Sequence, residues 1–298
     1  MKPGFIYIKT RDGFTLPGLF YEPKKSSKAI IVLHGNGTSS IFYGETLNKN
    51  LSEELAKKNI ALLTFNNRGA HIKKGLYVDK GRGKPKKYVY GGMAYELIKE
   101  CVEDIDGAIT FLKKRGYKEI SLIGFSTGAN KICVYNHYKK DNGVSKYVLV
   151  GGGDDTGIYY HEIGREKFFK LLKKAKTMKT KKRGDELISE IVPMIFSWKA
   201  FYDIANPDGD YNTFPFYEAL RRVKLSTKSL FRYFRAIKKP SLVIYGSEDE
   251  YAWGNASRAV AVLKKNNPGL DYKIIEGGDH GLSEHTKQLS RMVANWLS

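Results

Sequence analysis

Short, wholly apolar runs recur along the chain, and most are followed by a segment whose apolar residues have helical spacing. Residues 29–33 are one such run, and residues 60–65 are another in which Thr64 is the only polar residue. Each is bounded by charged or glycine-rich residues. Runs of this kind are typical of strands in a sheet that is covered on both faces. Alternating strands and helices form βαβ units with right-handed crossovers. The sequence therefore predicts an α/β protein with a mostly parallel sheet and helices on both faces.

The same alternation can be followed through most of the chain. Strands are expected at residues 5–10, 15–21, 29–33, 60–65, 119–124, 146–150, 241–245 and 271–276. The clearest helix is expected at residues 94–115, where apolar side chains recur every three or four positions and Gly116 follows. Residues 71–92 are rich in Lys, Gly and Tyr, which predicts a long loop of the kind that borders a site.

The alternation is interrupted between residues 154 and 237. This segment is long, aromatic and basic, and it contains no buried strand pattern. Helices are expected near residues 162–176, 184–202, 215–223 and 227–236. The sequence therefore predicts a core domain made of residues 1–153 and 238–298, with residues 154–237 inserted as a helical cap.

The composition is that of a globular protein with a large core. Hydrophobic residues make up 42% of the 298 residues and charged residues 28%. No apolar run approaches the roughly 18 residues needed to span a bilayer, and the first residues lack the apolar stretch of a signal peptide. We therefore expect a cytoplasmic protein without a membrane span. Cys101 and Cys133 fall on expected helices and predict buried thiols rather than a disulfide or a metal site.

The net charge of +20 suggests at first a protein that binds phosphates. The lysines, however, are scattered over nearly every expected helix and loop, and the densest run, residues 173–183, falls in the insertion. No nucleic-acid-binding motif accompanies them. The pattern favours a lysine-rich, solvated surface over attraction of anionic substrates, and it argues against nucleic acid as a partner.

One pentapeptide carries a chemical signature. Residues 124–128 read Gly-Phe-Ser-Thr-Gly, between an expected strand and an expected helix. Glycines two positions on either side of Ser126 allow a sharp strand-to-helix turn that projects the hydroxyl. The turn also places Ser126 at a helix N-terminus, where amides can stabilise an oxyanion. We therefore interpret Ser126 as a candidate nucleophile.

Possible partners of Ser126 follow two later strands. Asp249 comes after the strand at residues 241–245, and His280 comes after the strand at 271–276, so the order is Ser, acid, His. This order suits the nucleophile-elbow arrangement, in which the histidine accepts the serine proton and the carboxylate orients the ring. Asp249 is ranked first because it lies three residues past Gly246, at the tip of the loop. Glu248 and Glu250 compete for the role, and capping of the next helix is the structural alternative for Asp249.

An oxyanion hole needs one amide after the nucleophile and another from the loop after an earlier strand. Thr127 supplies the first, and Asn36, within the sequence His-Gly-Asn-Gly at residues 34–37, is expected to supply the second. His34 is interpreted as a structural brace without a chemical role.

Taken together, these motifs resemble the α/β-hydrolase superfamily over about residues 20–153 and 238–298. The resemblance rests on residues 34–37, 67–69, 124–128, 246–249 and 278–280. It implies an eight-stranded sheet, a triad of Ser126, Asp249 and His280, no metal or organic cofactor, and a cap domain at the position of the insertion. One departure is Asn67, where many members of the superfamily carry Asp.

The expected activity is hydrolysis of a carboxylic ester or thioester through an acyl-Ser126 intermediate. An acyltransferase with the same triad and a non-catalytic binding protein of the same fold are the alternatives, and the oligomeric state is left open. A dehalogenase or epoxide hydrolase would carry a carboxylate at position 126. The expected substrate is a medium-sized ester with an aromatic or acyl part and a negative charge. The aromatic residues that could line a cleft are Tyr77, Tyr88, Tyr90, Tyr159, Tyr160, Phe168, Phe169, Trp198, Phe201, Tyr202, Tyr211, Phe214, Phe216 and Tyr217.

Overall fold

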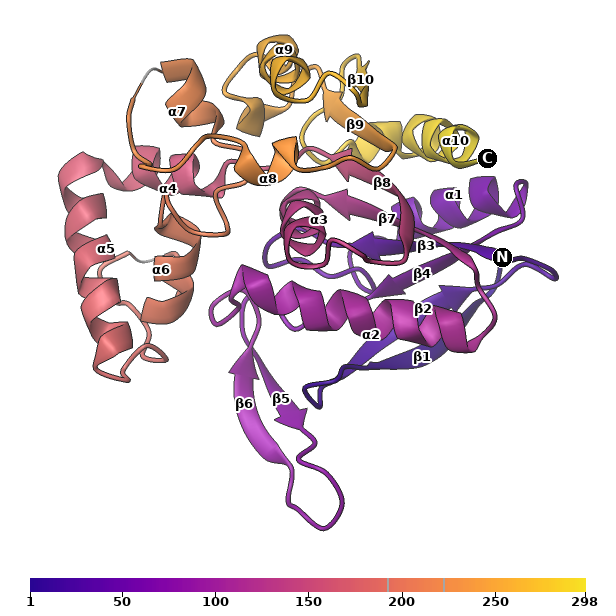
Figure 1. Cartoon of the computed structure of the whole chain (residues 1–298), viewed down its shortest axis with the longest axis horizontal. Coiled ribbons are helices and arrows are strands. Elements are labelled where there is room, and N and C mark those ends of the chain that lie inside the picture. The colour runs from indigo at the N-terminus through magenta and orange to yellow at the C-terminus, as the bar shows by residue number, and fades with distance from the viewer. Residues whose placement is uncertain (192, 222) are drawn as a thin grey trace.

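The computed structural model describes residues 1–191, 193–221 and 223–298 and contains an eight-stranded sheet (Figure 1). The strand order is β1-β2-β4-β3-β7-β8-β9-β10. The strands are β1 (Pro3–Lys9), β2 (Thr15–Tyr21), β3 (Lys28–Leu33), β4 (Ile60–Phe65), β7 (Glu119–Phe125), β8 (Val144–Val150), β9 (Ser241–Gly246) and β10 (Asp271–Ile275). Strand β2 pairs antiparallel with β1 and β4, and all other pairs are parallel. The predicted mostly parallel sheet is confirmed.

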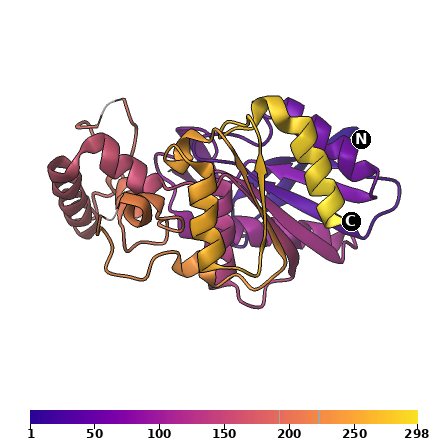
Figure 2. The same ribbon diagram turned by 90° about the horizontal axis from the view of Figure 1, so that it is seen from above.

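Different helices cover the two faces of the sheet (Figure 1 and Figure 2). Along β3, Ile30 packs into one apolar cluster and Ile31 into the other, because successive side chains of a strand point to opposite faces. The first cluster contains side chains of α1 (Glu45–Ala56) and α10 (Thr286–Leu297), and the second contains those of α2 (Cys101–Lys114), α3 (Thr127–Tyr138) and α9 (Ala256–Asn266). Cys101 and Cys133 are buried free thiols on α2 and α3.

The insertion between β8 and β9 is helical. Its helices are α4 (Asp155–Ile163), α5 (Arg165–Thr180), α6 (Trp198–Ala205), α7 (Phe216–Arg221) and α8 (Arg232–Arg235), and they gather beside the sheet (Figure 2). Side chains of the insertion and of one sheet face belong to a single apolar cluster, in which Phe216 contacts Tyr245 of β9 with ring centroids 6.1 Å apart. The division into a core domain and a cap stays a prediction.

Three of the helices expected in the insertion differ from the structure. The helix predicted at 227–236 is reduced to α8, because Phe231 directly before it has a φ of 55°, in the left-handed region. The helix predicted at 162–176 is divided at Gly164, whose φ of 80° interrupts it between α4 and α5. The helix predicted at 184–202 is wrong before Trp198, because Pro193 interrupts a helix and the Ile188 N–H donates across the loop to the Phe196 carbonyl. Val192 in this prediction, and Arg222 in the helix predicted at 215–223, lie outside the described residues.

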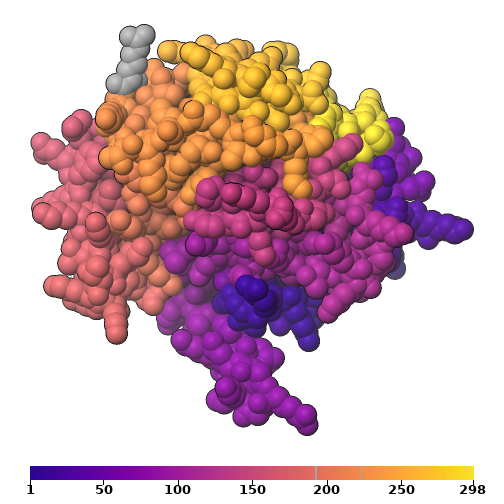
Figure 3. Space-filling model, in the orientation of Figure 1, coloured from indigo at the N-terminus to yellow at the C-terminus, as the bar shows by residue number. Residues whose placement is uncertain are grey.

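The long loop predicted at residues 71–92 is instead a β-hairpin that projects from the body of the molecule (Figure 1 and Figure 3). Strand β5 (Lys74–Val78) pairs antiparallel with β6 (Lys87–Gly91). Tyr77, Tyr88 and Tyr90 are exposed on it, and the rings of Tyr77 and Tyr88 meet edge to face with centroids 5.4 Å apart. Aromatic pairs across two strands stabilise such a ribbon, which explains why a glycine- and lysine-rich segment is ordered in this way.

The helix predicted at 94–115 begins later than expected. Its regular part is α2, which starts at Cys101 and follows a short 3₁₀ turn, Ile98–Glu100. Leu97 is extended, with φ of −108° and ψ of 128°, and the Ile98 N–H donates to the Asp203 carboxylate at 2.7 Å, so a regular helix cannot run through these residues. The helical spacing therefore continues through residues whose amides are bonded elsewhere.

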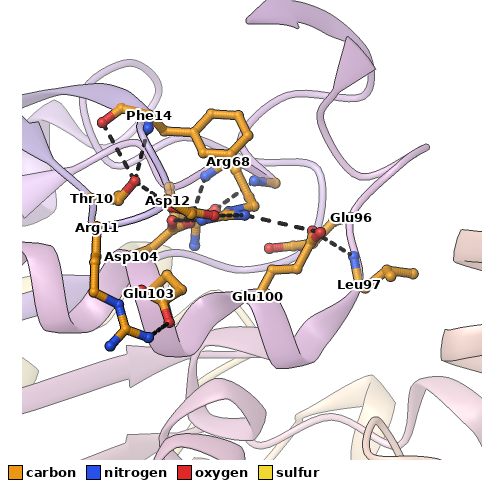
Figure 4. A network of polar contacts seen from close by, with 12 residues as sticks. Thr10, Arg11, Asp12, Phe14, Arg68, Glu96, Leu97, Glu100, Glu103 and Asp104 are labelled. Carbon is orange, nitrogen blue, oxygen red and sulfur yellow. Dashed lines mark hydrogen bonds and ion pairs between the residues drawn. The ribbon is translucent and has the colours of Figure 1, made fainter. Parts of the chain in front are cut away.

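Buried ion pairs join the base of the hairpin to the helices (Figure 4). Two nitrogens of the Arg68 guanidinium donate to the Asp104 carboxylate at 3.0 and 2.7 Å, and a third lies 2.9 Å from Asp12. Lys131 of α3 forms a second pair with Glu96 at 2.7 Å, and their side chains are 0% and 3% exposed. Such pairs contribute little net stability by themselves, but removing one partner leaves an uncompensated buried charge.

No described helix combines the length and the apolar character that crossing a bilayer requires.

Candidate active site

Ser126 lies at the turn between β7 and α3, with φ of 52° and ψ of −123°. Residues other than glycine rarely adopt this conformation, which costs about 1–3 kcal/mol and persists where the surroundings impose it. A Cβ atom at Gly124 would lie 2.3 Å from the Gly128 carbonyl, and one at Gly128 would lie 2.2 Å from the Leu33 oxygen. Both positions therefore require glycine, and the close approach that they permit keeps the turn sharp.

The His280 ring is paired with Asp249. Its Nδ1 lies 2.9 Å from the Asp249 Oδ1, which also accepts a hydrogen bond from the Tyr251 N–H at 2.9 Å. Asp249 thus caps the short turn that follows it and contacts the imidazole as well. Glu250 accepts a hydrogen bond from the His280 backbone N–H instead, at 3.0 Å. Of the three consecutive acids considered from the sequence, Asp249 is the one placed on the ring.

The surroundings of His280 change its protonation. Burial lowers the pKa of His280, but the hydrogen bond with Asp249 and the negative charges of Asp249, Glu250 and Asp155 outweigh it, so the pKa is raised above its ordinary value. The Asp249 side chain is only 1% exposed, which keeps its charge close to the ring and shielded from water. The same acids therefore favour the imidazolium form.

Ser126 and His280 line one cavity of about 500 Å³. No described hydrogen bond joins the Ser126 Oγ to the His280 ring. The described residues around this cavity are Gly35, Asn36, Thr38, Met93, Phe125, Ser126, Gly153, Asp155, Ile158, Tyr159, Glu162, Met194, Tyr251, His280 and Gly281. Elements far apart in sequence, from the loop after β3 to the loop after β10, thus meet at the carboxyl ends of the parallel strands, where open α/β sheets bind their ligands.

The two amides expected to form an oxyanion hole come from two segments that meet at Ser126. Thr127 is the first residue of α3, and the first amides of a helix lack acceptors within it. Asn36 belongs to the loop that passes against Ser126, since a Cβ at Gly35 would lie 3.1 Å from the Ser126 Cβ. The ring of His34 is buried, with its Nδ1 2.8 Å from the Gly35 oxygen, and it is not among the described lining residues.

Asp155 also lines the cavity, a role that was not predicted from the sequence. A Cβ at Gly153 would lie 3.7 Å from the Asp155 Oδ2 and 3.9 Å from the Ser126 Oγ, so both oxygens flank the same glycine. Burial raises the pKa of Asp155 to about 6, although the charges of His280 and Lys131 and the Thr127 hydroxyl oppose it. The available signal was its position, shortly after a buried strand that ends at the same sheet edge as Ser126.

The aromatic residues considered from the sequence have different surroundings. Of that set, only Tyr159 is among the described residues that line the cavity, and two other aromatic residues, Phe125 and Tyr251, line it as well. Most of the others are buried in the core, and the hairpin tyrosines are exposed.

Asn67, the departure from the superfamily pattern, is buried and accepts a hydrogen bond from the Gly69 N–H at 2.9 Å, a contact that a carboxylate could also make.

The sheet order and its helical layers define an α/β-hydrolase fold, as the comparison with solved structures shows. A family model described as "Protein of unknown function (DUF1749)" matches residues 86–298, more than half of the chain. The chain belongs to this family. The search among curated proteins found no match.

Several solved structures are similar over nearly the whole chain. Est1E from Butyrivibrio proteoclasticus with bound ferulic acid is 14% identical, covering 98% of this chain and 97% of its own, with a TM-score of 0.60. The Pyrococcus furiosus esterase Pf2001 is 18% identical, with coverages of 99% and 92% and a TM-score of 0.58. The α/β hydrolase GrgF from Penicillium sp. sh18 is 15% identical, with coverages of 100% and 98% and a TM-score of 0.62. At these identities the similarity shows the shared fold.

Proposed function

We propose that this protein is a serine hydrolase that cleaves a carboxylic ester or thioester through an acyl-Ser126 intermediate. The observation that carries the proposal is a single cavity lined both by Ser126, at its strained turn, and by His280, whose ring is bound to Asp249. The likeness of the fold to a protein named an esterase supports the choice of ester hydrolysis.

In the proposed mechanism, Asp249 accepts a hydrogen bond from the His280 Nδ1–H and thereby leaves Nε2 free to accept the Ser126 proton. The Ser126 Oγ attacks the ester carbonyl, and the backbone N–H groups of Asn36 and Thr127 donate to the oxyanion. His280 then returns the proton to the leaving alcohol or thiol. A water molecule deprotonated by His280 releases the acid from Ser126. The contact between Ser126 and His280 is expected to tighten when substrate binds, as it does in many hydrolases.

The proposed substrate is a small-molecule ester with an aromatic or acyl part. The cavity volume of about 500 Å³ falls in the range typical of small-ligand sites, and Phe125, Tyr159 and Tyr251 offer apolar surface. The bound ferulic acid in the similar Est1E structure supports an aromatic part.

Labelling with a fluorophosphonate probe tests the proposed nucleophile. We expect one covalent adduct, located by mass spectrometry on the peptide that contains Ser126 and absent in Ser126→Ala. Ser189→Ala, which changes an exposed serine of the insertion, should still be labelled. Folded wild-type protein without an adduct would contradict the proposal and favour a non-catalytic binding protein of this fold. Hydrolysis and acyl transfer are distinguished by adding an acceptor alcohol to a reaction with an ester labelled in its acyl part. A labelled acid indicates hydrolysis, and a new labelled ester indicates acyl transfer.

The pH dependence of kcat/KM provides an independent prediction. A general base must be neutral, so activity should fall as the pH drops below the raised pKa of His280. Asp249→Asn removes the negative charge and the carboxylate hydrogen bond that raise this pKa, so the acid limb of the profile should move to lower pH. The same substitution should lower kcat by about 10⁴-fold. The charge of Asp155, whose own pKa is raised to about 6, also contributes to the raised pKa of His280, so Asp155→Asn is measured in parallel.

The same shift has a consequence for stability. Because the folded-state pKa of His280 is raised, its contribution to stability is complete below the unfolded value of about 6.5 and is lost as the pH rises through the folded value. Denaturant unfolding across this range should show that loss in wild type and less of it in Asp249→Asn. An unchanged acid limb and an unchanged pH dependence of unfolding in Asp249→Asn would argue against the pairing.

A further inference from the structure

The wall of the cavity formed by α4 carries negative charge. Asp155, Tyr159 and Glu162 are four and three residues apart, so they share one face of this helix, and all three line the cavity. Asp154 fixes the start of the helix by accepting a hydrogen bond from the Gly157 N–H at 2.9 Å. The spacing of these residues on the capped helix therefore places two carboxylates and one aromatic ring in the wall of the cavity.

The charge of this lining is opposite to that of the protein. The chain has 51 Lys and Arg residues against 31 Asp and Glu residues, yet none of the described lining residues is Lys or Arg. His280 is the one described lining residue that can carry a positive charge, and it must be neutral when it acts as the base. The negatively charged substrate expected from the lysine content is therefore not favoured, because in the active state it would meet two carboxylates and no cation.

Neither carboxylate is paired with a cation within the described residues. No described Lys, Arg or His nitrogen lies within 4.0 Å of Asp155 or Glu162. The described hydrogen bond of the Asp155 side chain comes from the Thr127 hydroxyl and is long, at 3.4 Å. Lys131, the nearby buried cation, is paired with Glu96. Asp155, which is partly buried, therefore gains most from a cation that a ligand brings with it, and the exposed Glu162 gains less.

The aromatic rings of the cavity fit the same kind of ligand. Tyr159 and Tyr251 line the cavity together with Phe125, and the Tyr251 ring stands edge to face with the His280 ring, with centroids 4.6 Å apart. The face of an aromatic ring attracts an ammonium or guanidinium group, and the attraction grows when water is excluded. The carboxylates and the aromatic rings thus favour the same chemical class of ligand, an organic cation.

We propose that the substrate of this protein carries a cationic group, of the ammonium or guanidinium class, which Asp155 and Glu162 hold in the cavity beside Ser126. The inference rests on the proposed function, since it takes Ser126 as the atom that attacks. Asp155 and Ser126 flank the same glycine, so the cation must lie within a few bonds of the ester carbonyl.

Matched pairs of esters test this specificity. Acetylcholine is compared with its neutral isostere 3,3-dimethylbutyl acetate for a cation in the alcohol, and β-alanine ethyl ester with ethyl butanoate for a cation in the acyl part. We expect kcat/KM for the cationic member of at least one pair to exceed that of the neutral member by about tenfold or more. Asp155→Asn should bring this ratio close to one, and Glu162→Gln should reduce it. Glu166→Gln, which removes an equal charge from α5 outside the described lining, should leave it unchanged.

A second readout separates this inference from the proposed function. If the protein hydrolyses the neutral and cationic esters equally and Asp155→Asn does not alter the ratio, the cation site is wrong and the serine hydrolase assignment stands. If no ester is cleaved, acetylcholine and 3,3-dimethylbutyl acetate are titrated calorimetrically into Ser126→Ala. Binding of acetylcholine alone, lost in Ser126→Ala/Asp155→Asn, supports the site, and equal or absent binding of both compounds overturns it.

Discussion

Ser126→Ala is expected to lower kcat for ester hydrolysis by about 10⁴- to 10⁶-fold, the loss seen when the nucleophile of a triad is removed. Alanine lacks the attacking oxygen but has the same Cβ, so the substitution adds no atom to the strained turn. The fold should therefore survive, and the loss should fall on kcat rather than on KM. p-Nitrophenyl esters of increasing chain length, assayed with wild type and the variant, provide the measurement.

The matched control for this substitution is Ser189→Ala, whose kcat should equal that of wild type. Circular dichroism and thermal unfolding of Ser126→Ala show whether the variant is folded. Activity that survives in folded Ser126→Ala would refute the role of Ser126 as nucleophile, even if His280 and Asp249 proved essential.

Lys131→Met is expected to produce the largest loss of stability, about 3–5 kcal/mol, because it leaves the Glu96 carboxylate buried without its partner. The Lys131 side chain is 0% exposed and its ammonium lies 2.7 Å from Glu96, so water cannot easily replace it. Urea unfolding measures the loss. Lys131→Met/Glu96→Gln, which removes both charges, should recover part of it.

An exposed pair next to the same helix supplies the comparison for Lys131. Lys139 lies 2.7 Å from Asp106, with side chains 37% and 30% exposed, so Lys139→Met should cost only about 0–1 kcal/mol. Equal losses in Lys131→Met and Lys139→Met would show that burial does not set the strength of these pairs here.

The sheet and the position of Ser126 were predictable because their signals are local. A short apolar run bounded by glycines predicts a buried strand, and the strand-turn-helix context of Gly124 and Gly128 predicts the sharp turn. The same reasoning led to His280. The choice among Glu248, Asp249 and Glu250 depended on where each side chain points after β9, which sequence spacing alone does not determine.

The parts that were missed depend on contacts between distant segments. The hairpin of β5 and β6 is stabilised across its strands by the contact of Tyr77 with Tyr88, which the loop-like composition of this segment did not reveal. The late start of α2 follows from the extended backbone at Leu97 and from the Ile98 N–H, which donates to Asp203 of the insertion. Asp155 was given no role in the site, although it follows the end of β8 and lines the cavity with Ser126. Composition and periodicity describe each segment separately and do not reveal such pairings.

The packing of α4 has a consequence for the entropy of ligand binding. The face of this helix opposite Asp155 and Glu162 is held in the core, where Tyr160 contacts Phe168 and Tyr217 with ring centroids 5.3 and 5.6 Å apart. A ligand that binds against α4 therefore meets a wall that is already ordered, and little of its binding free energy is consumed in immobilising the helix. Selectivity between ligands at this helix then follows from the fixed positions of its side chains and not from a rearrangement of the helix around each ligand.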